Sequence, residues 1–176
     1  MSQRCVTLIG PMGSGKTSVG KKLAETLGYK FVDTDHLVEK EAGKKIVQIF
    51  DEHGEAHFRQ LESQVIARLA GSQSQVIATG GGAVIDPQNR HVLDGLGLVV
   101  YLKATARELY QRVKNDSMRP LLLKAEDPRK EMARILQERE KLYLDADIVI
   151  DTEELSVEEV ADVLIDELAK RTVGDA

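Results

Sequence analysis

Residues 8–23, LIGPMGSGKTSVGKKL, carry the strongest single signal in this chain. From Gly10 to Thr17 they match the pattern G-x-x-x-x-G-K-[ST], with an apolar run before it and a helical apolar spacing after it. Glycines let backbone N–H groups turn toward phosphate oxygens, and the N-terminus of the following helix adds positive potential. The stretch therefore predicts a strand, a phosphate-binding loop and a helix that together hold a nucleoside triphosphate.

The side chains of this loop have separate expected roles. Lys16 is expected to reach the β and γ phosphates, and the Thr17 hydroxyl is expected to coordinate Mg²⁺. The nucleotide contacts predicted within the loop are Gly13, Ser14, Gly15, Lys16, Thr17 and Ser18. The pattern does not identify the group that accepts the phosphate, so that information has to come from the rest of the chain.

Apolar runs alternate with amphipathic stretches along the whole chain. The runs at 5–10, 29–35, 74–82, 96–105 and 147–152 predict strands, and the stretches at 16–28, 35–43, 55–71, 106–116, 129–146 and 156–171 predict helices. Residues 117–128 are expected to form a loop. This alternation predicts an α/β protein, with a five-stranded parallel sheet between two helical layers, in a single domain spanning residues 1–176.

Composition narrows the class of partner. The net charge is −5, which argues against nucleic acid as the main partner because phosphate-backbone binding requires a basic face. No apolar run reaches membrane-spanning length, so we expect no membrane partner and a cytoplasmic location. The single Cys5 cannot form an internal disulfide and is expected to be a buried strand residue, which agrees with a reducing compartment. We expect a monomer.

Two carboxylates at the end of the second predicted strand are the candidates for chemistry. The chain lacks the N-K-x-D segment with which GTPases read guanine, and neither the third nor the fourth predicted strand ends in Asp. Asp33 and Asp35 lie in FVDTD, at the edge of the sheet where ligands bind in such folds. One could organise Mg²⁺ and the other could accept a hydroxyl proton, although Asp35 could instead cap the following helix.

Taken together, six segments resemble the shikimate kinase family. They are GPMGSGKTSVGKKLA, FVDTD, HGEAHFRQLE, ATGGGAV, RPLL and EREKLY, in this order, and the resemblance extends from about residue 4 to 170. It implies ATP-dependent phosphorylation of the 3-hydroxyl of shikimate, a step toward chorismate and the aromatic amino acids. It also implies the P-loop fold of the nucleoside monophosphate kinases, with a substrate-binding region at about 34–62 and a mobile lid at about 112–126.

The resemblance assigns a role to each candidate site residue. Asp35 would contact the hydroxyl that is phosphorylated, and Arg59 and Arg139 would hold the carboxylate of shikimate. Thr17 and Asp33 are the expected Mg²⁺ residues. A guanidinium fork suits this task because it matches a carboxylate bidentately. The glycines at the end of the third predicted strand would line the substrate ring, where bare backbone permits close approach. These glycines are Gly80, Gly81 and Gly82.

The resemblance places two further arginines at the nucleotide. Arg112 would lie near the adenine, and Arg119, in the lid, would meet the phosphates. Arg119 precedes Pro120 in the predicted loop, and such a loop can close over ATP and exclude water. With Lys16 and Asp35, Arg119 completes the expected catalytic set. In the aligned region beside the adenine, where the family usually has a polar residue, this chain has Leu155 or Ser156.

Two other functions are also compatible with a phosphate-binding loop in this fold. Another small-molecule kinase of the same fold, such as a gluconate kinase, would not require Arg59, Arg139 and the D-x-D pair together. A nucleotide-binding regulatory module without catalysis would not need Lys16 and Arg119 in addition to the acidic pair. Shikimate kinase activity therefore remains the main prediction, with ATP and shikimate as partners.

Overall fold

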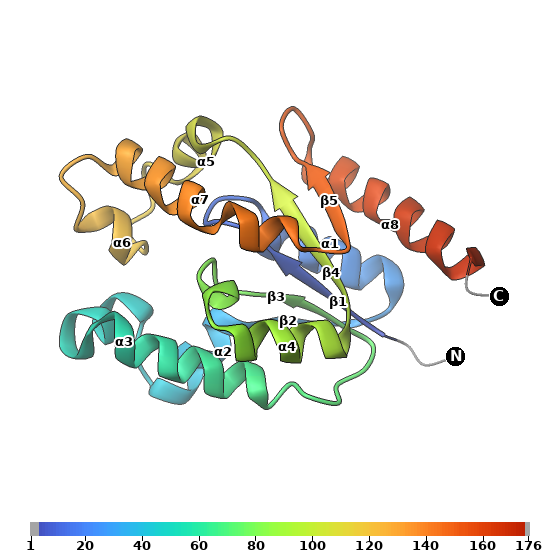
Figure 1. Cartoon of the computed structure of the whole chain (residues 1–176), viewed down its shortest axis with the longest axis horizontal. Coiled ribbons are helices and arrows are strands. Elements are labelled where there is room, and N and C mark those ends of the chain that lie inside the picture. The colour runs from blue at the N-terminus through green and yellow to red at the C-terminus, as the bar shows by residue number, and fades with distance from the viewer. Residues whose placement is uncertain (1–3, 175–176) are drawn as a thin grey trace.

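The fold is a five-stranded parallel sheet with helices on both sides (Figure 1). The computed structural model describes residues 4–174, and side chains as far as Arg171. The sheet order is β2-β3-β1-β4-β5, and all paired neighbours are parallel. The strands are β1 (Cys5–Ile9), β2 (Lys30–Asp33), β3 (Gln75–Ala78), β4 (Gly97–Lys103) and β5 (Ile148–Asp151). This confirms the predicted α/β class and the number of strands.

The described part of the chain contains eight α-helices and one 3-10 turn; α8 follows the last strand, and the others connect the strands. The helices are α1 (Lys16–Leu27), α2 (Thr34–Ala42), α3 (Ile46–Ala67), α4 (Pro87–Leu96), α5 (Ala106–Val113), α6 (Pro120–Leu123), α7 (Pro128–Leu144) and α8 (Val157–Gly174). The 3-10 turn η1 spans Ala83–Ile85. Among these helices, none has the length and apolar character needed to span a bilayer.

The alternation of side chains along β1 explains the two helical layers. Val6 and Leu8 point to one face and pack with residues of α1 and α8, including Leu23 and Leu164. Cys5 and Ile9 belong to clusters on the other face, together with Ile66 of α3, Leu93 of α4 and Tyr143 of α7. Cys5 is fully buried, as predicted. Because both faces are covered, the strands read as continuous apolar runs in the sequence.

Three predicted elements differ from those observed. The long helix was expected to start at residue 55, but α3 starts at Ile46 and continues across a kink at Gly54. No helix was predicted for residues 87–96, which form α4 behind the cap Asp86 and the first-turn Pro87. The predicted loop at 117–128 contains the short helix α6.

The kink in α3 depends on one glycine. Gly54 has φ 81° and ψ 173°, a conformation that residues with a side chain rarely adopt. A Cβ at this position would meet no atom within 4 Å, so backbone strain is the whole expected cost. We expect Gly54→Ala to lower the free energy of unfolding by about 1–3 kcal/mol, measured by denaturant titration.

Gly95 provides the matched control. It lies inside α4 without a positive φ, and a Cβ there would also meet nothing within 4 Å. Alanine favours helix more than glycine does, so Gly95→Ala should leave stability unchanged or raise it by up to about 1 kcal/mol. Equal destabilisation by both substitutions would show that the kink is not a strained glycine site.

Candidate functional site

The phosphate-binding loop has the backbone that its glycines predict. Gly10, Gly13 and Gly15 all have positive φ, at 142°, 81° and 91°. The Lys16 ammonium group folds back into the loop and donates to the carbonyl oxygens of Gly10 and Pro11, at 2.8 Å each. Burial lowers the pKa of Lys16 to about 8, and the nearby charge of Arg119 acts in the same direction. An anion in the loop would offset both effects.

Thr17 and Asp33 meet at the mouth of the loop. The Thr17 hydroxyl donates to Asp33 Oδ2 at 2.9 Å. Hydroxyl and carboxylate oxygens are hard ligands of the kind that Mg²⁺ accepts, and Mg²⁺ commonly takes few protein ligands beside phosphate and water. Residues 4–174 contain no group of three or more His, Cys, Asp or Glu side chains that could hold a metal alone. The pair therefore fits Mg²⁺ bound together with a nucleotide.

The structure separates the two acidic residues of FVDTD. Asp33 caps α2, because its Oδ1 accepts from the backbone N–H groups of Asp35 and His36, at 3.0 and 3.2 Å. The alternative that Asp35 caps this helix is therefore wrong: α2 starts one residue earlier than expected, and Asp35 lies in its first turn. Asp35 is left with a buried Oδ1 that has no hydrogen-bond partner among the described residues.

Asp35 shares its surroundings with a second buried carboxylate that sequence reasoning missed. Glu62 of α3 is 1% exposed, and its Oε1 also lacks a partner among the described residues. A Cβ built on Gly80 would lie 2.4 Å from Glu62 Oε1 and 2.6 Å from Asp35 Oδ1, so both oxygens approach this glycine. Burial raises the pKa of Asp35 to about 6, with the charges of Glu62 and Asp33 acting in the same direction. Burial also raises the pKa of Glu62.

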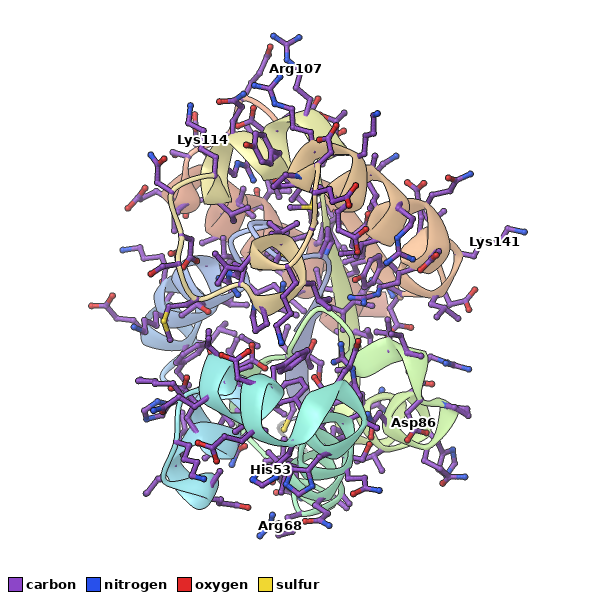
Figure 2. The ribbon with its side chains drawn as sticks, turned by 90° about the vertical axis from the view of Figure 1, so that its left-hand side faces the viewer. His53, Arg68, Asp86, Arg107, Lys114 and Lys141 are labelled. Atoms are coloured by element: carbon purple, nitrogen blue, oxygen red, sulfur yellow. The ribbon has the colours of Figure 1, made fainter. Side chains whose placement is uncertain are left out.

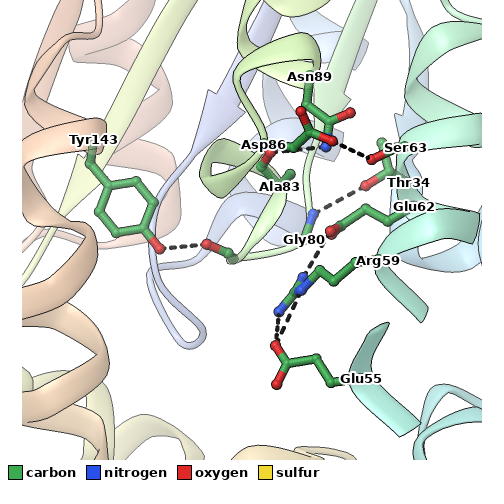
Figure 3. A network of polar contacts seen from close by, with 11 residues as sticks. Thr34, Glu55, Arg59, Glu62, Ser63, Gly80, Ala83, Asp86, Asn89 and Tyr143 are labelled. Atoms are coloured by element: carbon green, nitrogen blue, oxygen red, sulfur yellow. Dashed lines mark hydrogen bonds and ion pairs between the residues drawn. The ribbon is translucent and has the colours of Figure 1, made fainter. Parts of the chain in front are cut away.

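The three glycines after β3 are each held closely (Figure 3). The Gly80 N–H donates to the Thr34 hydroxyl at 3.1 Å, and the Gly81 carbonyl accepts from the Tyr143 hydroxyl at 2.5 Å. A Cβ on Gly82 would lie 2.3–2.4 Å from the guanidinium of Arg59. A side chain at Gly80 would collide with the acidic pair, and one at Gly82 would collide with Arg59. A Cβ on Gly81 would come no closer than 3.3 Å to the backbone of the phosphate-binding loop, at Met12 N.

Arg59 and Arg139 come from different helices and line the same cavity. Arg59, on α3, donates from Nη1 to Glu62 Oε2 at 2.8 Å and from Nε and Nη2 to Glu55 Oε1 at 3.2 and 2.9 Å (Figure 3). Arg139, on α7, is buried and 7% exposed. It lies near Tyr143, whose pKa is raised to about 12 by burial while Arg139 acts in the opposite direction.

One cavity is lined by all six predicted substrate-binding residues and by Arg119. Its lining includes seven of the predicted positions, which are Asp35, Arg59, Gly80, Gly81, Gly82, Arg119 and Arg139. The remaining lining was not predicted and, apart from Glu62, is apolar: Met12, Ile46, Phe50, Phe58, Met118, Pro120 and Leu121. The cavity therefore combines a charged floor with apolar walls, as a site for a small cyclic anion would.

Helix α6 lies on the outer side of this cavity. Figure 2 looks onto this end of the molecule and shows α6 above α3, with His53 on the side of α3 remote from α6. Arg119 precedes the first residue of α6, and its Nε donates to Asp116 Oδ2 at 2.9 Å. Lys124 Nζ lies 2.9 Å from Asp51 Oδ1, which links the end of α6 to α3. The predicted lid segment thus contributes directly to the cavity.

Arg112 lies apart from the cavity, beside the phosphate-binding loop. Its guanidinium donates to the Gly13 carbonyl at 3.3 Å and to both the hydroxyl and the carbonyl of Thr152, at 3.2 Å each. It therefore joins α5, the loop and the segment after β5. Ser156, in that segment, caps α8 together with Glu159.

Comparison with known proteins gives consistent matches along nearly the whole chain. A family model described as shikimate kinase matches residues 12–169. The chain is 48% identical to a shikimate kinase from Geobacter sulfurreducens, covering 89% of this chain and 86% of that protein. It is 42% identical to one from Histophilus somni, covering 93% and 94%. Its structure matches that of a shikimate kinase from Acinetobacter baumannii in complex with shikimate, with a TM-score of 0.92, 37% identity and coverage of 96% and 94%.

Proposed function

Because the chain belongs to the shikimate kinase family, we propose that it transfers the γ-phosphoryl group of ATP to the 3-hydroxyl of shikimate, giving shikimate 3-phosphate and ADP. It is a nucleotide-dependent kinase of aromatic amino acid biosynthesis. One observation carries the detailed proposal: a buried carboxylate, Asp35, shares one cavity with Arg59 and Arg139, beside a phosphate-binding loop. This arrangement suits an acceptor that has both a hydroxyl and a carboxylate.

The acceptor's carboxylate is assigned to the two arginines. Arg59 and Arg139 approach the cavity from α3 and α7, so an anion between them would be held from two sides. Hydrogen bonds between guanidinium and carboxylate are charge-assisted and fix orientation as well as affinity. The apolar walls, including Phe58, would cover the ring of the acceptor.

Asp35 is proposed to accept the proton of the acceptor's hydroxyl group. As the acceptor hydroxyl attacks the γ-phosphorus, an O–P bond forms, the P–O bond to ADP breaks and the hydroxyl proton passes to Asp35. A carboxylate with a pKa of about 6 is a stronger base than an ordinary aspartate and is still ionised at neutral pH. Lys16 and Arg119 would stabilise the charge on the transferring group.

Mg²⁺ is the expected metal. Thr17 and Asp33 would hold it, directly or through water, and when bound it would neutralise charge on the β and γ phosphates. Asp33 can serve because its Oδ1 caps α2 while its Oδ2 faces Thr17.

Residues 112–126 are proposed as a lid. The part around α6 contributes Met118, Arg119, Pro120 and Leu121 to the cavity, so it can exclude water from the γ-phosphate. Residues 34–62 are proposed as the substrate-binding region of the same single domain, since they supply Asp35, Arg59 and Glu62.

An assay of ADP release with three acceptors tests the function. We expect turnover with shikimate and ATP in the presence of Mg²⁺, and little above the acceptor-free rate with gluconate or AMP. Preference for gluconate would favour another small-molecule kinase of this fold. ATP binding without acceptor-dependent ADP release would favour a regulatory module instead.

A further inference from the structure

Arg59 is held by two glutamates whose surroundings differ sharply. Glu62 is buried, with its side chain 1% exposed, and takes one N–H from Nη1. The Glu55 side chain is 45% exposed, and its Oε1 accepts from both Nε and Nη2, at 3.2 and 2.9 Å (Figure 3). Glu55 therefore covers one whole edge of the guanidinium from the solvent side.

The covered edge is one that a bound carboxylate would use. A carboxylate pairs with guanidinium through two parallel N–H donors, and Nε and Nη2 form one of the two edges that offer such a pair. At the other edge, Nη1 is already engaged by Glu62. Glu62 cannot be moved aside without disturbing a buried group, whereas Glu55 can turn into solvent.

We propose that Glu55 occupies the place of the acceptor's carboxylate on Arg59 until the acceptor displaces it. This inference rests on the proposed function, because it takes the acceptor to be a carboxylate bound by Arg59. Glu55 follows the Gly54 kink directly and is the first residue of the second part of α3, four residues before Arg59. Its exchange with the acceptor would keep the charge of Arg59 paired in both states. It would also make the apparent affinity for the acceptor weaker than the cavity alone allows.

The size of the effect follows from the position of the pair at the surface, where the Glu55 side chain is 45% exposed and that of Arg59 is 24% exposed. Exposed i,i+4 ion pairs contribute little, and their loss typically changes an equilibrium constant by about two- to fivefold. Glu55→Gln keeps the shape of the side chain but removes the competing charge. We therefore expect the Kd and the KM for shikimate to fall by about two- to fivefold in this variant. The kcat should stay within about twofold, because the proposed exchange takes place at Arg59, which is assigned to the acceptor's carboxylate and not to the transferring phosphoryl group.

Glu52→Gln is the matched control. Glu52 lies on the same helix, is exposed and pairs with Lys44 instead of Arg59. The control removes the same charge and should leave the Kd for shikimate unchanged. An equal gain in both variants would indicate general repulsion of an anion and would overturn the proposal. A weaker Kd in Glu55→Gln would overturn it too, because Glu55 would then be supporting Arg59 and not competing for it.

The methyl ester of shikimate separates carboxylate exchange from other causes. It lacks the negative charge that would compete with Glu55, so its Kd, measured by calorimetry, should be the same for the wild type and Glu55→Gln. A gain for the ester equal to that for shikimate would contradict the proposal. If the wild-type protein shows no turnover with shikimate, the proposed function itself fails. If the wild type turns over and the variant shows no gain, this inference alone fails.

Discussion

Asp35→Asn is expected to lower kcat by about 10²–10⁴ while raising the stability of the protein. The loss of turnover follows because an amide cannot accept the hydroxyl proton, which is the role proposed for this carboxylate. The gain in stability follows because the half-buried Asp35 lies beside Glu62 and Asp33 and has a buried Oδ1 without a hydrogen-bond partner among the described residues. Steady-state kinetics and denaturant unfolding of the same preparation measure both effects.

The size of the stability effect depends on pH. The pKa of Asp35 is raised from an ordinary 3.8 to about 6, so the folded protein holds this proton more tightly than the unfolded chain does. The resulting stabilisation is present below about pH 4 and is lost as the pH rises through about 6. Near pH 7 the ionised group costs about 1–3 kcal/mol, which asparagine would remove. Wild type and variant should therefore differ most at neutral pH and converge near pH 4.

The same titration should appear in the kinetics. In the wild type, kcat/KM for shikimate should fall as the pH drops through about 6, because protonated Asp35 cannot act as a base. Asp94→Asn is a suitable control, since Asp94 is exposed on α4 and outside the cavity. It should change neither kcat nor this pH profile. An Asp35→Asn variant with wild-type kcat would remove Asp35 from the proton transfer.

The sequence correctly predicted the elements whose ends are fixed by residues close to them in the chain. The phosphate-binding loop and α1 follow from glycine spacing, and Gly28 and Gly43 end α1 and α2 in left-handed conformation, as expected. The predicted helix at 156–171 begins at Ser156, which forms a capping box with Glu159 at the start of α8. The carboxyl ends of β2 and β3 could be placed together because parallel strands share one edge.

The elements that were missed lack such signals or contain misleading ones. Gly54 reads as an interruption of helical spacing, yet the chain remains helical on both sides of it. Helix α4 is short and rich in polar residues, and its start at Asp86-Pro87 reads equally well as a turn. In both cases packing against the rest of the molecule, which local spacing does not encode, decides the outcome.

Glu62 is a residue of the candidate site that the sequence did not predict. In the sequence it is one acid among several on an amphipathic helix, and nothing local marks it as 1% exposed. Its burial arises because Gly80, on a distant segment, approaches the same space. The one available signal was its spacing of three residues from Arg59, which places both on one face of α3.

Among substitutions in the proposed lid, residues 112–126, we expect Arg119→Ala to lower kcat the most. Arginines that stabilise the transferring phosphoryl group contribute roughly 10³–10⁵ in rate, so kcat should fall by a factor in this range. Arg119 lies in the acceptor cavity, and its charge contributes to the lowered pKa of Lys16, so the two cations converge on one region. The KM for shikimate should change much less, since Arg59 and Arg139 are proposed to hold the carboxylate.

Two further variants test whether the loss of kcat is specific to the guanidinium of Arg119. Arg119→Lys keeps the charge but loses the planar fork, so its kcat should lie between those of Arg119→Ala and the wild type. Arg129→Ala removes an equal charge from the exposed start of α7, where Arg129 lies over the Tyr110 ring at 5.3 Å, and kcat should stay near the wild-type value. In the contact of Arg119 with Asp116 the two side chains are 36% and 31% exposed, and such ion pairs contribute about 1 kcal/mol or less, so its loss alone cannot produce a thousandfold effect. A kcat for Arg119→Ala close to that of Arg129→Ala would therefore mean that Arg119 does not reach the transferring group.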